Sequence, residues 1–364
     1  MFNKSVRNIE FELTNRCNAG CPLCSRTGTN KGGLSDTVYN SGWKDLSKEV
    51  HHHVIDSLRK DHDVESIDYG GCYGDPLMHP KVLELLKYGE GIYQEVQTNA
   101  SLQTNKFWQS VAKIDKLRMW FHLDGLKDTN HIYRRYTDWS KIEKNAKTFL
   151  DAGGKGSWVF IVFRHNEHQV EEARELSKKW GFDEFIIKKT SRKFENGKHK
   201  TSKKVRTPHG IETISYEAPQ NPEYQAESVQ NSIVTEVPID CYSEKRGTFY
   251  ISCENKIYPC CVLGKEGFKN NHIDRTPDKV FDYIDYDISI NADNNKFNDI
   301  VKKYNDREDI YKLNWHERKF KHCIERCGRD VTCQKVHLPL MPDLGSKRFK
   351  GWEGPHNKRN IGLT

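Results

Sequence analysis

The 364-residue sequence lacks long apolar runs and any large excess of charge of one sign. Only 35% of its residues are hydrophobic, and no stretch approaches the roughly 20 apolar residues that a membrane helix needs. The N-terminus leads almost at once into a strand pattern, where a signal peptide would place an apolar core. The net charge of +7 is mild and indicates solubility more than nucleic-acid binding. These absences predict a cytoplasmic protein without a membrane partner.

Histidine is absent before His51, yet Cys17, Cys21 and Cys24 lie within eight residues of one another. A tetrahedral zinc site and an ordinary four-cysteine cluster both need four ligands. Three cysteines can instead hold three irons of a [4Fe-4S] cluster and leave the fourth iron open to a substrate or cofactor. The alternatives are a zinc knuckle or three unrelated thiols. All but one of the eleven cysteines fall into two groups with ligand-like spacing, which favours metal binding over disulfides.

Strand and helix patterns alternate along the first half of the chain. Strands are predicted at residues 9–13, 66–69, 93–98, 116–123, 157–163 and 185–188, and helices at 43–59, 82–88, 106–114, 141–152 and 167–180. Six such repeats predict a parallel sheet covered by helices. Polar motifs follow the strand C-termini, as they do in full barrels, so the pattern indicates an α/β fold built as a partial (β/α)6 barrel.

The spacing Cys-x3-Cys-x2-Cys after a short apolar strand resembles the signature of the radical S-adenosylmethionine (radical SAM) enzymes. The resemblance implies that the cluster, once reduced, cleaves S-adenosylmethionine and releases a 5′-deoxyadenosyl radical. It also implies that Leu23, just before the third cysteine, lies near the adenine. An external electron donor, similar to flavodoxin or ferredoxin, would reduce the cluster.

Motifs at two further strand ends resemble the family's cofactor pocket. Gly74-Asp75-Pro76 resembles Gly-Gly-Glu-Pro, whose backbone and acid accept hydrogen bonds from the methionyl ammonium. Asp75 is one methylene shorter than the usual Glu, so backbone carbonyls are expected to share its role. Thr98-Asn99-Ala100 resembles Thr-Asn-Gly, which implies that Asn99 shapes the pocket wall.

The fourth and fifth strands end in similar motifs. The sequence from His122 to Gly125 resembles Ser-Leu-Asp-Gly, and Asp124 is expected to accept from a ribose hydroxyl. Arg134, in preference to Arg135, is expected to pair with the methionyl carboxylate. Asn166 is expected to contribute a polar contact to the cofactor. The alternative for each motif alone is ordinary loop chemistry.

The second cysteine group resembles the SPASM extension of radical SAM maturases. The sequence predicts two strands around a turn at Glu254-Asn255 within residues 251–261. The later motif is Cys323-(x3)-Cys327-(x5)-Cys333-(x3)-His337, where the extension has Cys-x2-Cys-x5-Cys-x3-Cys. Its first gap is one residue longer, and His stands at its last ligand position. The resemblance implies a second [4Fe-4S] cluster. Its expected ligands are Cys241, Cys260 or Cys261, and Cys323, Cys327 and Cys333. A zinc site of Cys323, Cys327, Cys333 and His337 is the alternative. Cys72, outside both groups, is predicted to be a buried apolar residue.

These patterns divide the chain into four parts. We expect a radical SAM partial barrel at 1–190, a basic linker or lid at 191–240, a SPASM-like domain at 241–340 and a basic tail at 341–364. Residues 188–206 hold nine Lys or Arg and one Glu, and no clear periodicity extends to residue 230. The expected activity is that of a radical SAM oxidoreductase or maturase that abstracts hydrogen from a peptide, protein or small-molecule substrate. The alternative is an iron–sulfur or zinc module that contacts nucleic acid through 188–206.

Overall fold

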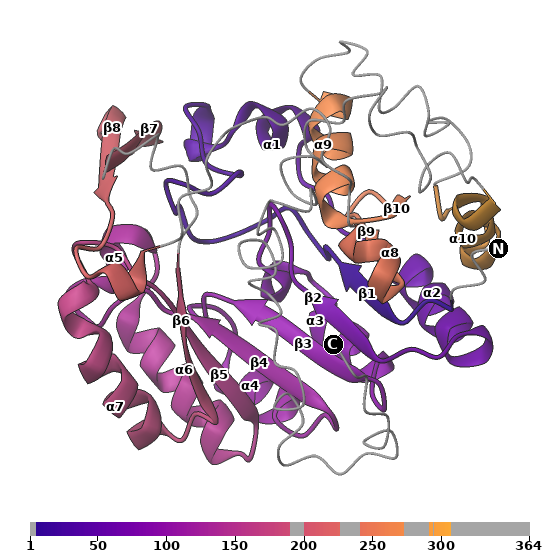
Figure 1. The fold of residues 1–364 in the computed structure, drawn as a ribbon, viewed down its shortest axis with the longest axis horizontal. Coiled ribbons are helices and arrows are strands. Elements are labelled where there is room, and N and C mark those ends of the chain that lie inside the picture. Colours follow the sequence, from indigo (N-terminus) through magenta and orange to yellow (C-terminus); the bar gives the residue numbers. More distant parts are fainter. Residues whose placement is uncertain (1–4, 190–199, 226–240, 273–290, 294, 307–364) are drawn as a thin grey trace.

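Strands β1 to β6 form a parallel sheet in sequence order, seen in a computed structural model that describes residues 5–189, 200–225, 241–272, 291–293 and 295–306 (Figure 1). The strands are β1 (Asn8–Phe11), β2 (Ser66–Tyr69), β3 (Tyr93–Thr98), β4 (Leu117–His122), β5 (Lys155–Ile161) and β6 (Glu184–Lys188). The predicted parallel α/β sheet is therefore confirmed, with strand ends within a few residues of those expected.

Helices connect these strands. They are α1 (Asp36–Ser41), α2 (Lys48–Asp61), α3 (Val82–Tyr88), α4 (Asn105–Val111), α5 (Asn130–Tyr133), α6 (Trp139–Asp151) and α7 (Val170–Trp180), with the short 3-10 helices η1 (Lys31–Gly33), η2 (Pro76–Met78) and η3 (Glu167–Gln169). Side-chain caps start several of them, since Ser47, Thr104 and Asp138 each accept from a backbone N–H in the first turn. The cap at Ser47 also explains why α2 begins later than the predicted residue 43.

The two faces of the sheet differ in polarity. Ile9 and Phe11 of β1 are buried in the main apolar core with the helices. Side chains alternate along a strand, so Glu10 and Glu12 lie on the opposite face. Glu12 is 1% exposed and Gln97 of β3 is 7% exposed, although both are polar. This polar face leads up to the strand C-termini, where the candidate site lies.

Residues 200–217, expected to lie in an irregular basic linker, form a β-hairpin instead. Strand β7 (Lys200–Thr207) pairs antiparallel with β8 (Gly210–Glu217). Val205 and Tyr216 are the apolar anchors, at 2% and 3% exposure, while lysines occupy several other positions of β7. The dense basic charge hides the period-2 pattern, which explains the missed prediction. A 3-10 helix, η4 (Pro222–Tyr224), follows.

The C-terminal hairpin joins the main sheet. Strands β9 (Thr248–Ile251) and β10 (Ile257–Tyr258) form the two strands predicted around Glu254-Asn255, and Asn255 adopts the left-handed region with φ 62°. However, β9 pairs in parallel with β1, so this hairpin extends the large sheet and not a separate small one. The SPASM-like domain is not confirmed. Helices α8 (Tyr242–Arg246), α9 (Cys261–His272) and α10 (Phe297–Asp306) complete the described elements.

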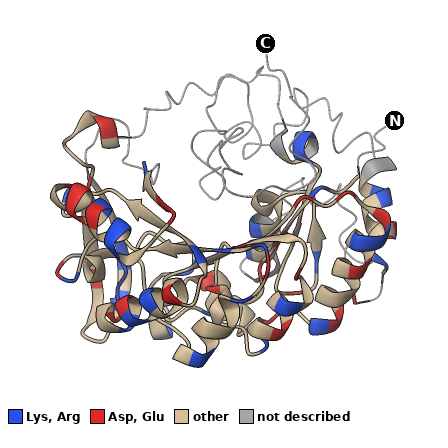
Figure 2. Ribbon diagram, turned by 90° about the horizontal axis from the view of Figure 1, so that it is seen from below, with Lys and Arg blue, Asp and Glu red and all other residues tan. Residues whose placement is uncertain are grey.

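The outer surface carries both signs of charge. Figure 2 shows Lys and Arg positions interspersed with Asp and Glu positions along the helices. Among the described helices, none combines the length and apolar character that crossing a membrane requires.

Candidate functional site

The loop after β1 gathers the three N-terminal cysteines beside one apolar cluster. Cys21 belongs to this cluster with Tyr133 and Phe163, and Cys17 and Cys24 pack against it. The cluster also takes up Leu23, Ala19, Ile161, Ile214 and Tyr216. A turn closes between the last two thiols, because Cys24 N donates to Cys21 O at 3.0 Å. The three thiols therefore lie at the same apolar cluster, while their binding to one iron–sulfur cluster stays a prediction.

Nitrogen donors face two of these sulfurs. The Ala19 N–H and the Asn99 amide lie 3.4 and 3.8 Å from Cys17 Sγ. Arg134 Nη1 lies 3.9 Å from Cys21 Sγ. Burial raises the pKa of the Cys17 thiol, and the nearby Asp75 carboxylate adds to the shift. A thiolate is thus costly here without a metal, and N–H groups aimed at sulfur suit a bound iron–sulfur cluster.

The donor set fits a cluster better than a single ion. No three His, Cys, Asp or Glu side chains of the described residues are grouped closely enough to hold one metal ion. A [4Fe-4S] cluster asks for a wider arrangement, since each thiolate binds a different iron. Cys17, Cys21 and Cys24 lie on one loop and none of them is in a disulfide, so they could bind three irons and leave the fourth without a cysteine.

Gly74 lies where the second strand end meets the cysteine loop. A Cβ at this position would lie 1.7 Å from Thr14 O, so no other residue fits without moving the backbone. Glu12 holds the same turn, because its carboxylate accepts from Tyr73 N at 2.6 Å and from Gly74 N at 3.2 Å. Tyr250 of β9 donates a short hydrogen bond to Glu12. Sequence analysis did not identify Glu12. Its only signal in the sequence is an acidic residue in a strand pattern, next to a residue of the apolar core.

Asp75 is engaged with the protein itself. Its carboxylate accepts from Leu77 N, Thr98 Oγ1, Asn99 N and Asn99 Nδ2 at 2.8 to 3.1 Å. Burial raises the pKa of Asp75 to about 6, and the hydrogen bonds partly offset that rise. The acid therefore fixes the Thr98-Asn99 turn against η2. Its expected contact with a methionyl ammonium stays a prediction.

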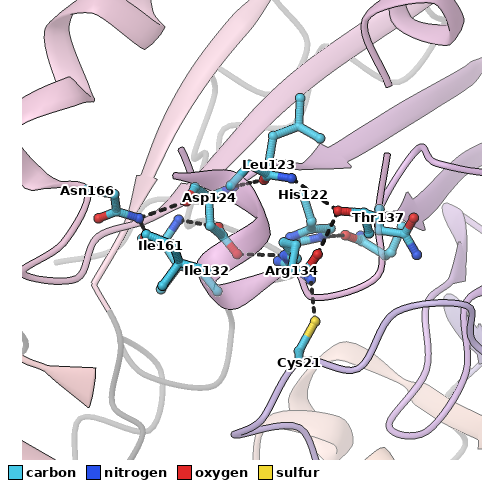
Figure 3. A network of polar contacts seen from close by, with 12 residues as sticks. Cys21, His122, Leu123, Asp124, Ile132, Arg134, Thr137, Ile161 and Asn166 are labelled. Atoms are coloured by element: carbon cyan, nitrogen blue, oxygen red, sulfur yellow. Dashed lines mark hydrogen bonds and ion pairs between the residues drawn. The ribbon is translucent and has the colours of Figure 1, made fainter. Parts of the chain in front are cut away.

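A polar network joins the fourth and fifth strand ends to the cysteine loop (Figure 3). Arg134 Nε donates to Asp124 Oδ2 at 2.6 Å, and Asp124 is fully buried. Ile161 N donates to the other oxygen, Asp124 Oδ1, at 2.7 Å. Burial alone would lower the pKa of Arg134, but Asp124 and Cys21 outweigh it, so the net pKa is raised and the guanidinium stays charged. Arg134 thus bridges Asp124 and Cys21.

Asn166 and His122 are both committed to neighbouring protein groups. Asn166 Oδ1 accepts from Phe163 N at 2.7 Å, and its amide donates to the carbonyls of Asp124 and Ile161. His122 Nε2 lies 2.6 Å from Gln97 Oε1. The structure therefore gives Asn166 and Asp124 positioning roles, and their expected contacts with the cofactor stay predictions.

The second cysteine group is only partly described. Cys260 and Cys261 lie at the start of α9, and Leu263 N donates to Cys260 Sγ at 3.5 Å. Cys261 packs against the main core, and its thiol bonds to Glu10. Cys241 precedes α8. The remaining predicted ligands, Cys323, Cys327 and Cys333, lie outside the described residues with His337, so the second cluster and the zinc alternative stay predictions.

Cys72 packs among apolar side chains, as expected, but it is only half-buried. It packs against a small cluster formed by Leu34, Val38, Tyr73, Cys253 and Phe268.

Residues 11–177 match the sequence model of the Radical SAM superfamily. This part of the chain is thus similar to the radical SAM domain. No curated protein matches the sequence. Among solved structures, the chain is similar to SuiB of Streptococcus suis bound to S-adenosylmethionine, with 15% identity and a TM-score of 0.46. The match covers 70% of this chain and 60% of the SuiB chain. The chain is also similar to anSMEcpe with bound AdoMet, with 14% identity and a TM-score of 0.47 over 89% of each chain.

A third structure, BtrN in complex with AdoMet and 2-DOIA, is similar at 11% identity with a TM-score of 0.41, over 89% of this chain and 93% of that one. The function proposed below for residues 11–177 therefore rests on the family match and on the side chains of the site.

Proposed function

We propose that Cys17, Cys21 and Cys24 hold an open-site [4Fe-4S] cluster and that the adjoining strand ends hold S-adenosylmethionine. When bound and reduced, the cluster would supply the electron that cleaves the sulfonium of S-adenosylmethionine and releases a 5′-deoxyadenosyl radical. The observation that carries the proposal is the meeting of the three thiols at one apolar cluster, inside the part of the chain that is similar to the radical SAM domain, with N–H donors facing the sulfurs.

The residues around the loop have distinct proposed roles. Gly74 lets the second strand end approach the loop and offers backbone acceptors to the methionyl ammonium. Arg134 is anchored through Nε and reaches the cysteine loop through Nη1, so its fork is the proposed partner of the methionyl carboxylate. Leu23 packs beside the cysteines as the proposed neighbour of the adenine. Asp75, Asp124 and Asn166 hold the walls in place.

The finer activity is also part of the proposal. We expect an oxidoreductase or maturase that abstracts hydrogen from a peptide, protein or small-molecule substrate, with a flavodoxin- or ferredoxin-like protein as electron donor. A nucleic-acid-binding module is not favoured, because such a module has no use for the radical SAM domain or for Arg134 beside Cys21.

Binding of S-adenosylmethionine to anaerobically reconstituted protein tests the cluster assignment. The protein is expected to bind iron and to change its electron paramagnetic resonance spectrum when the cofactor is added. Cys21→Ser should lose both properties, while Cys72→Ser, which changes a half-buried thiol outside the loop, should keep them. Equal iron content and an equal spectral change in the Cys21 variant would overturn the assignment.

The iron and zinc content of the protein distinguishes a second [4Fe-4S] cluster at the C-terminal cysteines from a zinc site. Two cubane clusters would give about eight irons per chain, four in each. Iron near four per chain with one zinc would show a structural zinc site and would leave the N-terminal chemistry unaffected.

A further inference from the structure

A small cleft opens beside the cysteine loop, between that loop and strand β7. Cys17 and Gly20 line one side of it, Arg135 and Tyr136 after α5 line another, and Arg206 of β7 lines a third. Its volume is about 90 Å³. One water needs roughly 10–15 Å³ of such space, so the cleft has room for several waters or for one tetrahedral or planar oxyanion group.

The lining of this cleft is basic. Arg26, Arg135 and Arg206 are among its lining residues, and no Asp or Glu lines the cleft. Within the described chain none of the three arginines forms an ion pair. Arg206 Nε donates to Thr29 O at 2.8 Å, and the Arg135 guanidinium lies 5.5 Å from the centre of the Tyr136 ring. These contacts orient the two side chains and supply no carboxylate partner from the described residues.

Arg26 makes the lack of a counter-ion a physical problem. It is only 7% exposed, and its Nε is buried with no hydrogen-bond partner. Its Nη1 donates to Ala19 O at 3.3 Å, and its guanidinium lies 5.8 Å from the centre of the Trp43 ring. A carbonyl and an aromatic face hold the group in place but carry no formal charge, and the nearby Cys17, whose pKa is raised by burial, is a neutral thiol unless it binds a metal. A buried charge is costly unless it is paired, and a guanidinium pairs best with a carboxylate or phosphate.

We propose that this arginine cleft binds the phosphate or carboxylate group of a small ligand. The site lies beyond the proposed cofactor pocket, because Gly74, Asp75, Asn99, Asp124 and Asn166 do not line it. Only Cys17 belongs to both. The ligand's anionic group would rest against Arg26, with Arg135 and Arg206 closing over it from the two sides.

Calorimetric titration of the full chain with inorganic pyrophosphate and, separately, with citrate tests the proposal. The chain is used without added iron or S-adenosylmethionine, so the result does not depend on radical chemistry. At least one anion should bind, and Arg26→Met should weaken it by about tenfold or more, as loss of a charge-assisted hydrogen bond does. Preference for pyrophosphate identifies a phosphate ligand, and preference for citrate a carboxylate ligand.

Two further variants keep the test decisive if Arg26→Met fails to fold. Arg206→Met changes an exposed side chain and should also weaken binding by several-fold. Arg174→Met, on the distant helix α7, should bind as the parent chain does and controls for lost surface charge. Absence of binding by both anions up to about 10 mM would overturn the proposal, as would equal affinity in the Arg206 and Arg174 variants.

Discussion

Buried carboxylates tie the ends of adjacent strands together at three places in the sheet. Glu12 accepts from the backbone at Tyr73, Asp75 from the backbone at Asn99, and Asp124 from the backbone at Ile161. Each acid therefore fixes the loop that follows an adjacent strand. Hydrogen bonds of this kind, made to charged groups in a dry setting, contribute about 1.5–3 kcal/mol each. The cofactor pocket is shaped by these bonds before any cofactor enters.

Gly74→Ala tests how tightly the second strand end packs on the cysteine loop. The added methyl would meet Thr14 O at 1.7 Å, which forces the backbone apart. We expect a loss of about 1–3 kcal/mol in the free energy of unfolding, with a weaker affinity for S-adenosylmethionine. Denaturant titration and cofactor binding measure the two effects. Gly91→Ala is the control, because open space surrounds that glycine and only its positive φ of 93° opposes the change. Equal cofactor affinity in both variants would contradict the account.

His51 on α2 predicts a specific loss of stability in acid. It is fully buried, its Nε2 lies 3.0 Å from Tyr69 Oη, and burial lowers its pKa to about 3, with the positive charge of neighbouring groups adding to the shift. The unfolded chain binds this proton near pH 6.5, so the native state binds fewer protons between these values. The free energy of unfolding should therefore fall as pH drops through this window, by up to about 1.4 kcal/mol per unit.

His51→Gln removes the titrating group and should flatten the pH dependence of stability between about pH 6 and 4. Denaturant midpoints at several pH values measure it. His52→Gln, one residue along the same helix and partly exposed, controls for the loss of a histidine. A parent-like slope in the His51 variant would show that another group causes the acid sensitivity.

Motifs could be recognised from the sequence, but the partners of their side chains could not. Short spacings identify the cysteine loop and the strand ends because those signals are local. The partners of Asp75 and Asp124 depend on how neighbouring strands align, which no local pattern encodes. The sequence therefore predicts only the cofactor contacts of both acids, and the structure adds that their oxygens bond to the protein.

Among the elements, the hairpin β7–β8 links two sides of the site. Lys203 Nζ donates to Cys24 O and Arg206 N donates to Gly28 O, both at 2.9 Å. On the other strand, Tyr216 Oη donates to Ile132 O at 2.9 Å. One hairpin thus spans from the cysteine loop to the segment that carries Arg134. Figure 1 shows it above α5, apart from the large sheet.

Tyr216→Ala should release this hairpin without unfolding the sheet. Tyr216 is 3% exposed and packs against Tyr133 and Phe163, while the hairpin itself lies outside the large sheet. We expect faster amide hydrogen exchange in residues 200–217 and in the cysteine loop, with little change in strands β2 to β4. Ile211→Ala, 54% exposed on the same strand, should leave the exchange unchanged. Uniform protection in both variants would show that Tyr216 does not anchor the hairpin.

Across the whole molecule, distant parts of the chain meet at β1. Strand β9 pairs with β1 across more than two hundred residues, and Tyr250 of β9 bonds to Glu12, which holds the turn at Gly74. The existence of the C-terminal hairpin could be predicted from its alternating residues and Asn255 turn. Its partner strand could not, because strand pairing is set by the packing of the whole fold.

Formation of 5′-deoxyadenosine is the decisive readout for radical chemistry at the cysteine loop. The full chain, reconstituted anaerobically with iron and sulfide, is reduced in the presence of S-adenosylmethionine, and the product is quantified by mass spectrometry. We expect the parent chain to form 5′-deoxyadenosine and Cys24→Ala to form none. The circular dichroism spectrum of the variant should match that of the parent, because a loop ligand lies outside the apolar core. Equal product from the parent and from Cys24→Ala, or none from a parent chain that has bound its iron, would contradict it.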